Sequence, residues 1–511
     1  MSSNKKSKTG RRKVSWKERA REVANTFEWL ITAFVLAFLF RAFVMEAFRI
    51  PTGSMAETLK GAHYRLRCIQ CGYRYDYGLG NFRLPRDVLP RGPLPPRPSR
   101  CPSCGYYYPN TGRGMWAANG DRILVLKCIY QFFEPKQWDV VVFKNPLNPS
   151  ENYIKRLVGR PGQTVEIIDG DVYIDGQISR KPSKVRDELW MPVYDNDYQP
   201  VRPRQGSFNG HNWQQPFRNV ADSQWQTDLQ RPTIFRLESS GEQIHTMFYD
   251  TTVGNDFRAS YAYDDVQDYS NMPYCSDLMV RFYARRQPGS GVVGIEMSKY
   301  ETNYRACVDS TGSMVIEKVA GGEEPEELAH RQLDLADEDG PSLVRFVNVD
   351  HELIFEFGRA KLTYDLGRGA EDAGERRADI QAEVKVFGSG SIELSHVAIF
   401  RDIHYTGTKY ANSRDAGRAV EGNPLKLDRD EFFVLGDNSP NSEDGRWWGA
   451  RGKGNNGISY RAGIVPRDYL VGKALFVYWP SGFRPYPRFP FGVIPNVGQM
   501  RFIYGGSARN P

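Results

Sequence analysis

FEWLITAFVLAFLFRAFVMEAFRIPTGSMAETL, residues 27–59, joins a long apolar run to a short loop that contains a single serine. A membrane span requires about 20 largely apolar residues. Residues 27–48 reach that length if Arg41 and Glu46 lie at the far interface, where long side chains extend to water. The run therefore predicts a transmembrane helix over residues 27–48. A cleaved signal peptide is the alternative, but the run is long and no clean Ala-x-Ala site follows it.

The net charge of the chain lies before this run. Residues 1–26 contain nine basic and two acidic residues, which accounts for the whole net charge of +7. Because the rest is close to neutral, we expect no nucleic-acid partner. Basic residues before the run and few after it predict a basic cytoplasmic arm over residues 1–26 and a location outside the cytoplasm for everything after residue 48. The sequence thus predicts a single-pass protein of the cytoplasmic (inner) membrane, in contact with lipid.

The length and composition of the chain set its expected architecture. A chain of 511 residues exceeds one ordinary core and predicts several domains. Its 48 glycines and 32 prolines favour short strands and turns over long helices. We therefore expect a mostly β fold behind the transmembrane helix.

Three segments after the apolar run contain residues suited to nucleophilic catalysis. Ser54 lies in a turn, where a serine taken alone would only cap the chain. In residues 152–165, NYIKRLVGRPGQTV, Lys155 interrupts an apolar strand. That lysine either points to solvent or is buried with a lowered pKa, and only the second case yields a base. Residues 436–449, GDNSPNSEDGRWWG, follow an apolar strand and form a polar loop or, with poorer spacing, a calcium loop.

In order and nearly residue for residue, these segments resemble the type I signal peptidases (leader peptidases), bacterial membrane-bound endopeptidases with a serine/lysine dyad. Residues 120–125 and 139–143 resemble the family's strands before the lysine. The resemblance implies a signal-peptidase-type β catalytic domain in residues 49–185 and 425–511. It also implies that Ser54 is the nucleophile and Lys155 the general base. The substrates would be signal peptides of exported preproteins with small residues at −1 and −3, and catalysis would need no cofactor.

The resemblance assigns the remaining site residues as well. The hydroxyl of Thr52, with the N–H of Ser54, would bind the oxyanion, and Ser442 would hydrogen-bond the lysine and orient it. Glu57 departs from the family, which usually has proline there. The residues expected to hold the third segment are Asp437, Asp444 and Arg446. Those expected to contact substrate are Ile50, Pro51, Met55, Leu59, Tyr153 and Ile154.

Two C-x-x-C pairs lie between the first and second segments. Cys68 and Cys71 form one pair, and Cys101 and Cys104 form the other. Paired knuckles of this kind suit tetrahedral zinc, so we expect a zinc-ribbon-like module over residues 66–108 with structural zinc on all four. Two disulfides are the alternative outside the cytoplasm. Cys128 is expected in a strand, and the remaining cysteines, Cys275 and Cys307, are candidates for a disulfide.

Residues 186–424 form a long insertion in the catalytic domain. Short alternating strands are expected at 278–283, 292–297, 343–349, 352–357 and 382–387, and the closing strand begins near residue 392. This pattern predicts a β-sandwich, and its closing strand resembles that of a concanavalin-like jelly roll. Exposed aromatics in such a sandwich could stack on a glycan, although most are expected in the core.

A second function class fits part of this pattern. The chain could be a non-catalytic, membrane-anchored binding protein, for instance one that binds glycans on a peptidase scaffold. The joint presence of Ser54, Lys155, Thr52 and Ser442 argues for the peptidase instead.

Overall fold

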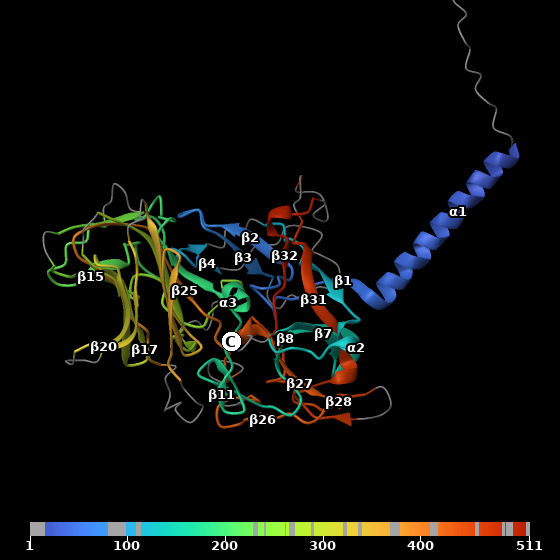
Figure 1. The fold of residues 1–511 in the computed structure, drawn as a ribbon. Coiled ribbons are helices and arrows are strands. Elements are labelled where there is room, and N and C mark those ends of the chain that lie inside the picture. Colours follow the sequence, from blue (N-terminus) through green and yellow to red (C-terminus); the bar gives the residue numbers. More distant parts are fainter. Residues whose placement is uncertain are drawn as a thin grey trace, which may run out of the picture.

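Strands dominate the computed structural model, as the composition predicts. Helix is mostly confined to the N-terminal segment, and the body consists of the catalytic-domain sheets, a small cysteine module and a β-sandwich (Figure 1). The structure describes residues 16–79, 99–108, 114–227, 233–239, 242–260, 262–264, 271–287, 291–319, 324–335, 340–367, 379–408, 417–454, 459–482, 486 and 494–506.

The N-terminal helix α1 (Trp16–Leu39) projects from the body as a single rod and continues as a π-helical turn, Phe40–Val44 (Figure 1). Residues Arg19–Val44 are long and apolar enough to cross a membrane by length and composition. The predicted boundary at residue 48 is wrong, because Met45–Arg49 form strand β1. In that strand Glu46 pairs with Lys127 at 3.1 Å. Residues 1–15 of the predicted basic arm lie outside the described residues.

The main sheet places the loop of Ser54 and the strand of Lys155 in one framework. Its strands are ordered β1-β6-β31-β7-β8-β27-β30, with β32 added beside β31. Strand β31 therefore lies between β6, the partner of β1, and β7, the partner of β8. The bounds are β6 Arg122–Leu126, β7 Val140–Asn145, β8 Asn148–Gly159, β27 Glu431–Leu435, β30 Val465–Pro466, β31 Leu470–Trp479 and β32 Arg501–Phe502.

A smaller sheet lies at the point where the insertion begins and ends. Its order is β11-β10-β9-β26, and β26 reaches it from the far side of the insertion. Its strands are β9 Thr164–Ile168, β10 Asp171–Ile174, β11 Gln177–Ile178 and β26 Leu425–Lys426. The remaining short elements are α2 Ile129–Phe132, α3 Ser183–Leu189, β28 Gly452–Lys453, β29 Ser459–Tyr460, η4 Ser439–Asn441, η5 Arg467–Tyr469 and η6 Val497–Gln499. Cys128 caps α2 and is half-buried, so its predicted place in a strand is wrong.

The insertion is a sandwich of two seven-stranded sheets around one apolar core, as its alternating strands predict. The first sheet contains β12 Met191–Asp195, β14 Ile234–Glu238, β16 Leu278–Arg286, β21 Ser342–Val349, β22 Glu352–Phe357, β23 Ala360–Asp365 and β25 Ser391–Arg401. The second contains β13 Phe217–Asn219, β15 His245–Tyr249, β17 Val293–Lys299, β18 Thr302–Val308, β19 Ser313–Val319, β20 Glu326–Gln332 and β24 Val384–Gly388. Cys275 and Cys307 are both free thiols, so their expected disulfide is contradicted.

The cysteine module consists of two short hairpins. One pairs β2 (His63–Arg67) with β3 (Arg74–Gly78), and the other pairs β4 (Ser99–Arg100) with β5 (Tyr107–Tyr108). Alternate side chains of β2 and β3 form a small core with the cysteines and with Phe208 of the insertion. The module is therefore packed against the sandwich as well as against the catalytic domain.

Candidate active site

The serine and the lysine named from the sequence lie in direct contact. Lys155 Nζ donates a hydrogen bond to Ser54 Oγ at 2.6 Å. Lys155 belongs to β8, and Ser54 lies in the loop after β1. That loop is a compact turn, because Ala56 N–H donates to Gly53 O at 2.9 Å and Leu59 N–H donates to Met55 O at 2.7 Å. The fully buried Met55 anchors the turn in the core, so Ser54 is held against the lysine strand.

The environment of Lys155 favours its neutral form. Its side chain is only 4 % exposed, and removal from water lowers its pKa to about 8. The carboxylates of Asp444 and Asp437 act in the opposite direction without cancelling the effect of burial. A lysine with this pKa is substantially neutral at mildly alkaline pH, and its free electron pair then faces Ser54 Oγ.

The third segment packs directly on the nucleophile. Asn438 N–H donates to Ser54 O at 3.1 Å, and Asn438 Nδ2 donates to Gly53 O at 3.1 Å. The approach requires a glycine, because a Cβ on Gly436 would lie 2.5 Å from Ser54 O. The loop thus holds the two peptide groups that flank the Cα atom of Ser54.

Ser442 departs from its expected contact. Its Oγ is buried but has no hydrogen-bond partner among the described residues. The expected bond from Ser442 to Lys155 is therefore not formed in this structure, where Lys155 Nζ is bonded to Ser54. Ser442 Oγ lies instead over Gly436, where a Cβ would stand 2.1 Å away.

Two buried ion pairs hold the third segment. Arg446 Nε and Nη2 donate to Asp444 at 2.9 and 2.8 Å, and Nη1 donates to Thr406 O at 2.8 Å, where the insertion returns. Asp437 accepts two bonds of 2.7 Å from Arg156, the residue after Lys155. The sequence analysis grouped Asp437 with Asp444 and Arg446. In the structure Asp437 instead holds Arg156, and with it the strand that contains Lys155.

The remaining predicted residues fall into three surroundings. Ile50, Met55 and Leu59 are buried in one apolar cluster, against which Ile154 packs. Tyr153 belongs to a neighbouring cluster, and its ring centroid lies 5.7 Å from Lys155 Nζ. Pro51 and Thr52 are exposed.

The insertion supplies site contacts that the sequence analysis missed. Tyr263 is 3 % exposed and packs against Gly53, and Asp264 Oδ1 accepts a bond of 3.1 Å from Asn438 Nδ2. Both residues belong to an irregular segment between strands, and no motif marked them. The contact of Tyr263 with Gly53 and that of Asp264 with Asn438 follow only from how the insertion packs.

Comparison with known proteins agrees with this geometry. A family model described as signal peptidase, peptidase S26, matches residues 110–215 and 394–479. The chain carries a signal peptidase domain. The matched part of this signal peptidase domain includes Lys155, Ser442 and Arg446, begins after Ser54, and is interrupted by most of the sandwich.

Curated relatives of the signal peptidase domain are bacterial. Signal peptidase I of Rickettsia canadensis (strain McKiel) is 32 % identical over 157 residues, which is 30 % of this chain and 44 % of that protein. Signal peptidase I of Rickettsia akari (strain Hartford) is 31 % identical over 156 residues, with the same coverage of 30 % and 44 %. The chain spans less than half the length of the curated relatives it matches.

Solved structures resemble the chain only slightly. The carbohydrate-binding module CBM66 from Bacillus subtilis is 10 % identical, with a TM-score of 0.24, covering 36 % of this chain and 94 % of that one. Galectin LEC-6 of Caenorhabditis elegans is 9 % identical, with a TM-score of 0.18, covering 25 % and 87 %. Scores this low carry no argument about the sandwich.

Proposed function

We propose that the protein is a membrane-bound signal peptidase that removes N-terminal signal peptides from exported preproteins. The observation that carries the proposal is the 2.6 Å contact between Lys155 Nζ and Ser54 Oγ. A serine hydroxyl needs a base within hydrogen-bond reach, and a lysine serves as one only when burial lowers its pKa. Both conditions are met here, which disfavours a binding protein on an inactive scaffold.

The reaction is an acyl transfer through Ser54. Neutral Lys155 accepts the proton of Ser54 Oγ while that oxygen bonds to the scissile carbonyl carbon. When the tetrahedral intermediate collapses, the C–N bond breaks and Lys155 returns the proton to the leaving amine. The signal peptide then remains as an ester on Ser54. Lys155 deprotonates a water molecule, which hydrolyses the ester and regenerates the hydroxyl.

The oxyanion and the substrate would be held by groups beside the nucleophile. The N–H of Ser54 and the exposed hydroxyl of Thr52 have no hydrogen-bond acceptor or donor within the described part of the chain, so both are available to an oxyanion. The substrate would bind as an extended strand. Ile50 and Met55, which are buried in one apolar cluster, and Ile154, which packs against it, would favour small residues at −1 and −3. Pro51, Leu59 and Tyr153 complete the proposed contact set, while Ser442 would donate to Lys155 once substrate displaces the resting contact.

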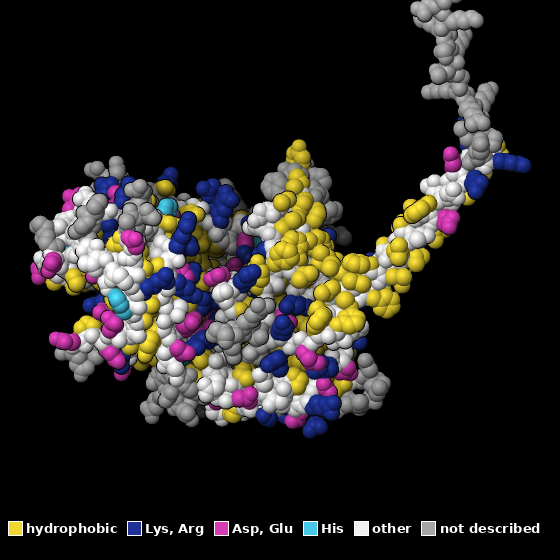
Figure 2. All heavy atoms as spheres, in the orientation of Figure 1, with side chains coloured by type: hydrophobic (Ala, Val, Ile, Leu, Met, Phe, Trp, Pro, Cys, Tyr) yellow, Lys and Arg dark blue, Asp and Glu magenta, His cyan; other side chains and the backbone are white. Residues whose placement is uncertain are grey.

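We propose that the body rests on the membrane that α1 crosses. Exposed apolar side chains continue from α1 over the adjoining surface of the body (Figure 2). Burying this apolar ridge in lipid is favourable at about 25 cal/mol per Å². With the basic arm in the cytoplasm, the catalytic domain would face the extracytoplasmic side. Outside the sandwich, exposed large apolar residues of the body include Phe132, Phe133, Ile494, Val497 and Phe502.

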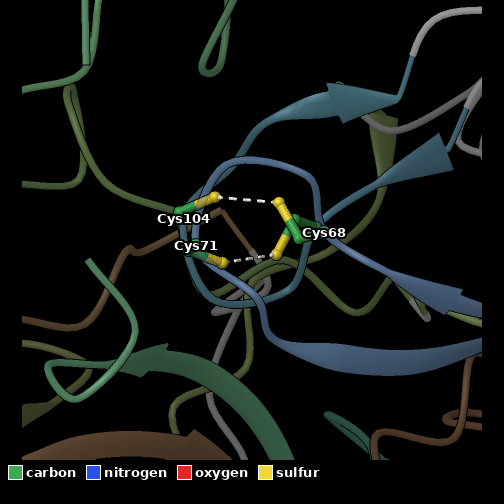
Figure 3. A group of neighbouring side chains, drawn as sticks. Cys68, Cys71 and Cys104 are labelled. Atoms are coloured by element: carbon green, nitrogen blue, oxygen red, sulfur yellow. Dashed lines mark hydrogen bonds between the residues drawn. The ribbon is translucent and has the colours of Figure 1, made fainter. Parts of the chain in front are cut away.

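The four paired cysteines fit a structural zinc ion. Their Sγ atoms all lie within 4.8 Å of one another, and the side chains of Cys68, Cys71 and Cys104 point toward one another (Figure 3). All are free thiols, with 3.7 Å between Cys68 and Cys104 and 3.6 Å between Cys71 and Cys101. The N–H of Tyr73 faces Cys71 Sγ at 3.5 Å, as a thiolate ligand requires. We propose zinc here as a support of the module, with no part in catalysis.

A glycan ligand for the sandwich has narrower support. Most of its aromatic side chains are core, and Tyr283 of β16 is 42 % exposed. A glycan would therefore stack on Tyr283. To test this, wild type and Tyr283→Ala are passed over a column of immobilised glycan, and the variant should no longer be retained.

The decisive test is cleavage of a preprotein with an Ala-x-Ala site by the detergent-solubilised full chain. We expect wild type to cleave it and neither Ser54→Ala nor Lys155→Ala to do so. Circular dichroism establishes that both variants are folded. If the wild-type protein is folded but does not cleave the preprotein, the binding-protein alternative is favoured.

A further inference from the structure

A cavity of about 590 Å³ lies beside the nucleophile loop. One part of its wall is Glu57 and Lys60 of that loop, and another is the β2–β3 hairpin. The insertion closes it with residues 190–193 and with Asn255, Asp256, Arg258, Ser260 and Ala262. The cavity is therefore shared by the catalytic domain, the cysteine module and the sandwich.

The wall of this cavity carries a surplus of positive charge. Seven of its residues are Lys or Arg and three are Asp or Glu. The acidic residues are already paired: Glu57 and Asp76 contact Lys60 at 3.1 and 2.6 Å, and Asp256 contacts Arg258 at 3.3 Å. Lys60 and Arg258 thus pair with all three carboxylates of the wall between them. Arg65, Arg67 and Arg74 of the hairpin are among the other five cations of the wall.

The hairpin concentrates this surplus on one face. Its tyrosines and leucine belong to the core around the cysteines. The alternate positions, Arg65, Arg67, Arg74 and Asp76, line the cavity together with Leu66, Tyr73 and Tyr75. Arg67 and Arg74 stand directly opposite each other in the ladder. Like charges at such positions destabilise a hairpin. Within the described ranges neither arginine forms an ion pair with a carboxylate, so an anion between them would relieve the repulsion.

We propose that the cavity binds acidic side chains of the mature part of the preprotein, the segment that follows the scissile bond. This inference rests on the proposed function. Glu57 follows Ser54 by three residues, so their Cα atoms lie at most about 11 Å apart. An extended substrate covers that distance in about four residues. Carboxylates match the planar fork of a guanidinium.

The difference in chemistry between the signal-peptide contacts and the cavity favours the mature segment as the occupant. The contacts proposed for the signal peptide, Ile50, Met55 and Ile154, are apolar, whereas ten residues of the cavity wall are charged. An anionic lipid headgroup shares the carboxylate's charge. To bind there, however, the lipid headgroup would have to enter a cavity whose wall is formed in part by the nucleophile loop and the sandwich.

The test compares three preproteins with the same signal peptide and the same Ala-x-Ala site. They differ at positions +3 to +6, which are acidic, amide or lysine residues. With the full chain in neutral detergent, we expect a KM for the acidic substrate roughly fivefold below that for the amide substrate, at similar kcat. Raising the salt to about 0.5 M should remove the difference. In Arg67→Glu/Arg74→Glu the order should reverse in favour of the lysine substrate.

Arg160→Glu provides the matched control, because Arg160 is exposed at the end of β8 and is not part of the cavity wall. This variant should keep the wild-type order. Equal KM values for the three substrates, or an unchanged order in the double variant, would overturn the proposal. So would a double variant that loses binding to phosphatidylglycerol vesicles while its substrate order is unchanged, since lipid would then be the occupant. If wild type cleaves none of the substrates, the proposed function itself fails.

Discussion

Tyr263, a residue of the insertion, packs its ring against Gly53, which precedes the nucleophile. A Cβ on Gly53 would lie 2.2 Å from Tyr263 Cε1, and a Cβ on Gly78 of β3 would lie 2.4 Å from the same atom. The ring is thus held between two glycines, and Tyr263 O accepts a bond of 2.7 Å from Gly78 N–H. The sandwich and the cysteine module therefore support the nucleophile loop jointly.

Gly53→Ala should lower kcat/KM by about 100-fold, because the ring cannot retreat past Gly78 and the nucleophile must shift instead. Steady-state cleavage of the Ala-x-Ala preprotein measures the effect. Gly449→Ala is the control, since nothing lies within 4 Å of its Cβ position. Adding Tyr263→Ala to Gly53→Ala should restore part of the activity. A fully active single variant would contradict the packing argument.

The cleavage rate should rise with pH up to about 8 and then level off. Burial lowers the pKa of Lys155 to about 8, and only the neutral amine is a base. Below that pH the neutral fraction falls about tenfold per unit. A pH profile of kcat/KM measures this dependence, with Lys155→Arg as an inactive reference at every pH. A flat profile between pH 6 and 9 would show that Lys155 is not the titrating base.

Arg446→Ala should lower the free energy of unfolding by about 3–5 kcal/mol, because Asp444 would remain buried without its partner. Arg446→Lys should not restore it, since one ammonium cannot replace bonds to Asp444, Thr406 and Ser439 together. Urea denaturation measures both. Arg467→Ala, which removes exposed pairs, should cost less than about 1 kcal/mol.

Lys181→Met should loosen the junction between the sandwich and the small sheet. Lys181 contacts Asp402 at 2.8 Å and also pairs with Asp350, all three buried. Burial raises the pKa of Asp402 to about 7, so its acid form is favoured in the fold. Stability linked to that proton is complete below about pH 4 and is lost as the pH rises through 7.

The destabilisation by Lys181→Met should therefore be larger at pH 8 than at pH 4.5. Thermal unfolding at the two pH values measures it, with Lys184→Met, a variant of the adjoining helix α3, as the control. An equal loss at both values would rule out the carboxylates as its cause.

Removal of zinc should weaken the cysteine module and spare the dyad. Elemental analysis should find about one zinc per chain, and Cys68→Ser/Cys104→Ser should abolish it and lower the unfolding temperature. Cleavage of the amide substrate should persist in the folded variant, because the ligands lie outside the dyad. Cys307→Ser controls for thiol loss. A zinc-free wild type would overturn the assignment.

The sequence predicted the parts that rest on local patterns. Alternation marked the sandwich strands, and an apolar strand interrupted by one lysine marked Lys155. The helix end was misplaced, because Met45, Ala47 and Phe48 continue the apolar run although they pair with β6. The pairing of Asp437 with Arg156, the contact of Tyr263 with Gly53 and the cavity could not be predicted. Each joins residues distant in sequence through packing that leaves no local signature.

The place of β31 in the main sheet has a consequence for the newly made chain. A chain that crosses the membrane from its N-terminus exposes Ser54 and Lys155 early, yet the strand that joins their two halves of the sheet comes near residue 470. Until β31 pairs with both β6 and β7, no strand connects the β7–β8 hairpin, which contains Lys155, to strands β1 and β6 beside the loop of Ser54. The proposed peptidase would then be inactive until β31 has taken its place in the sheet.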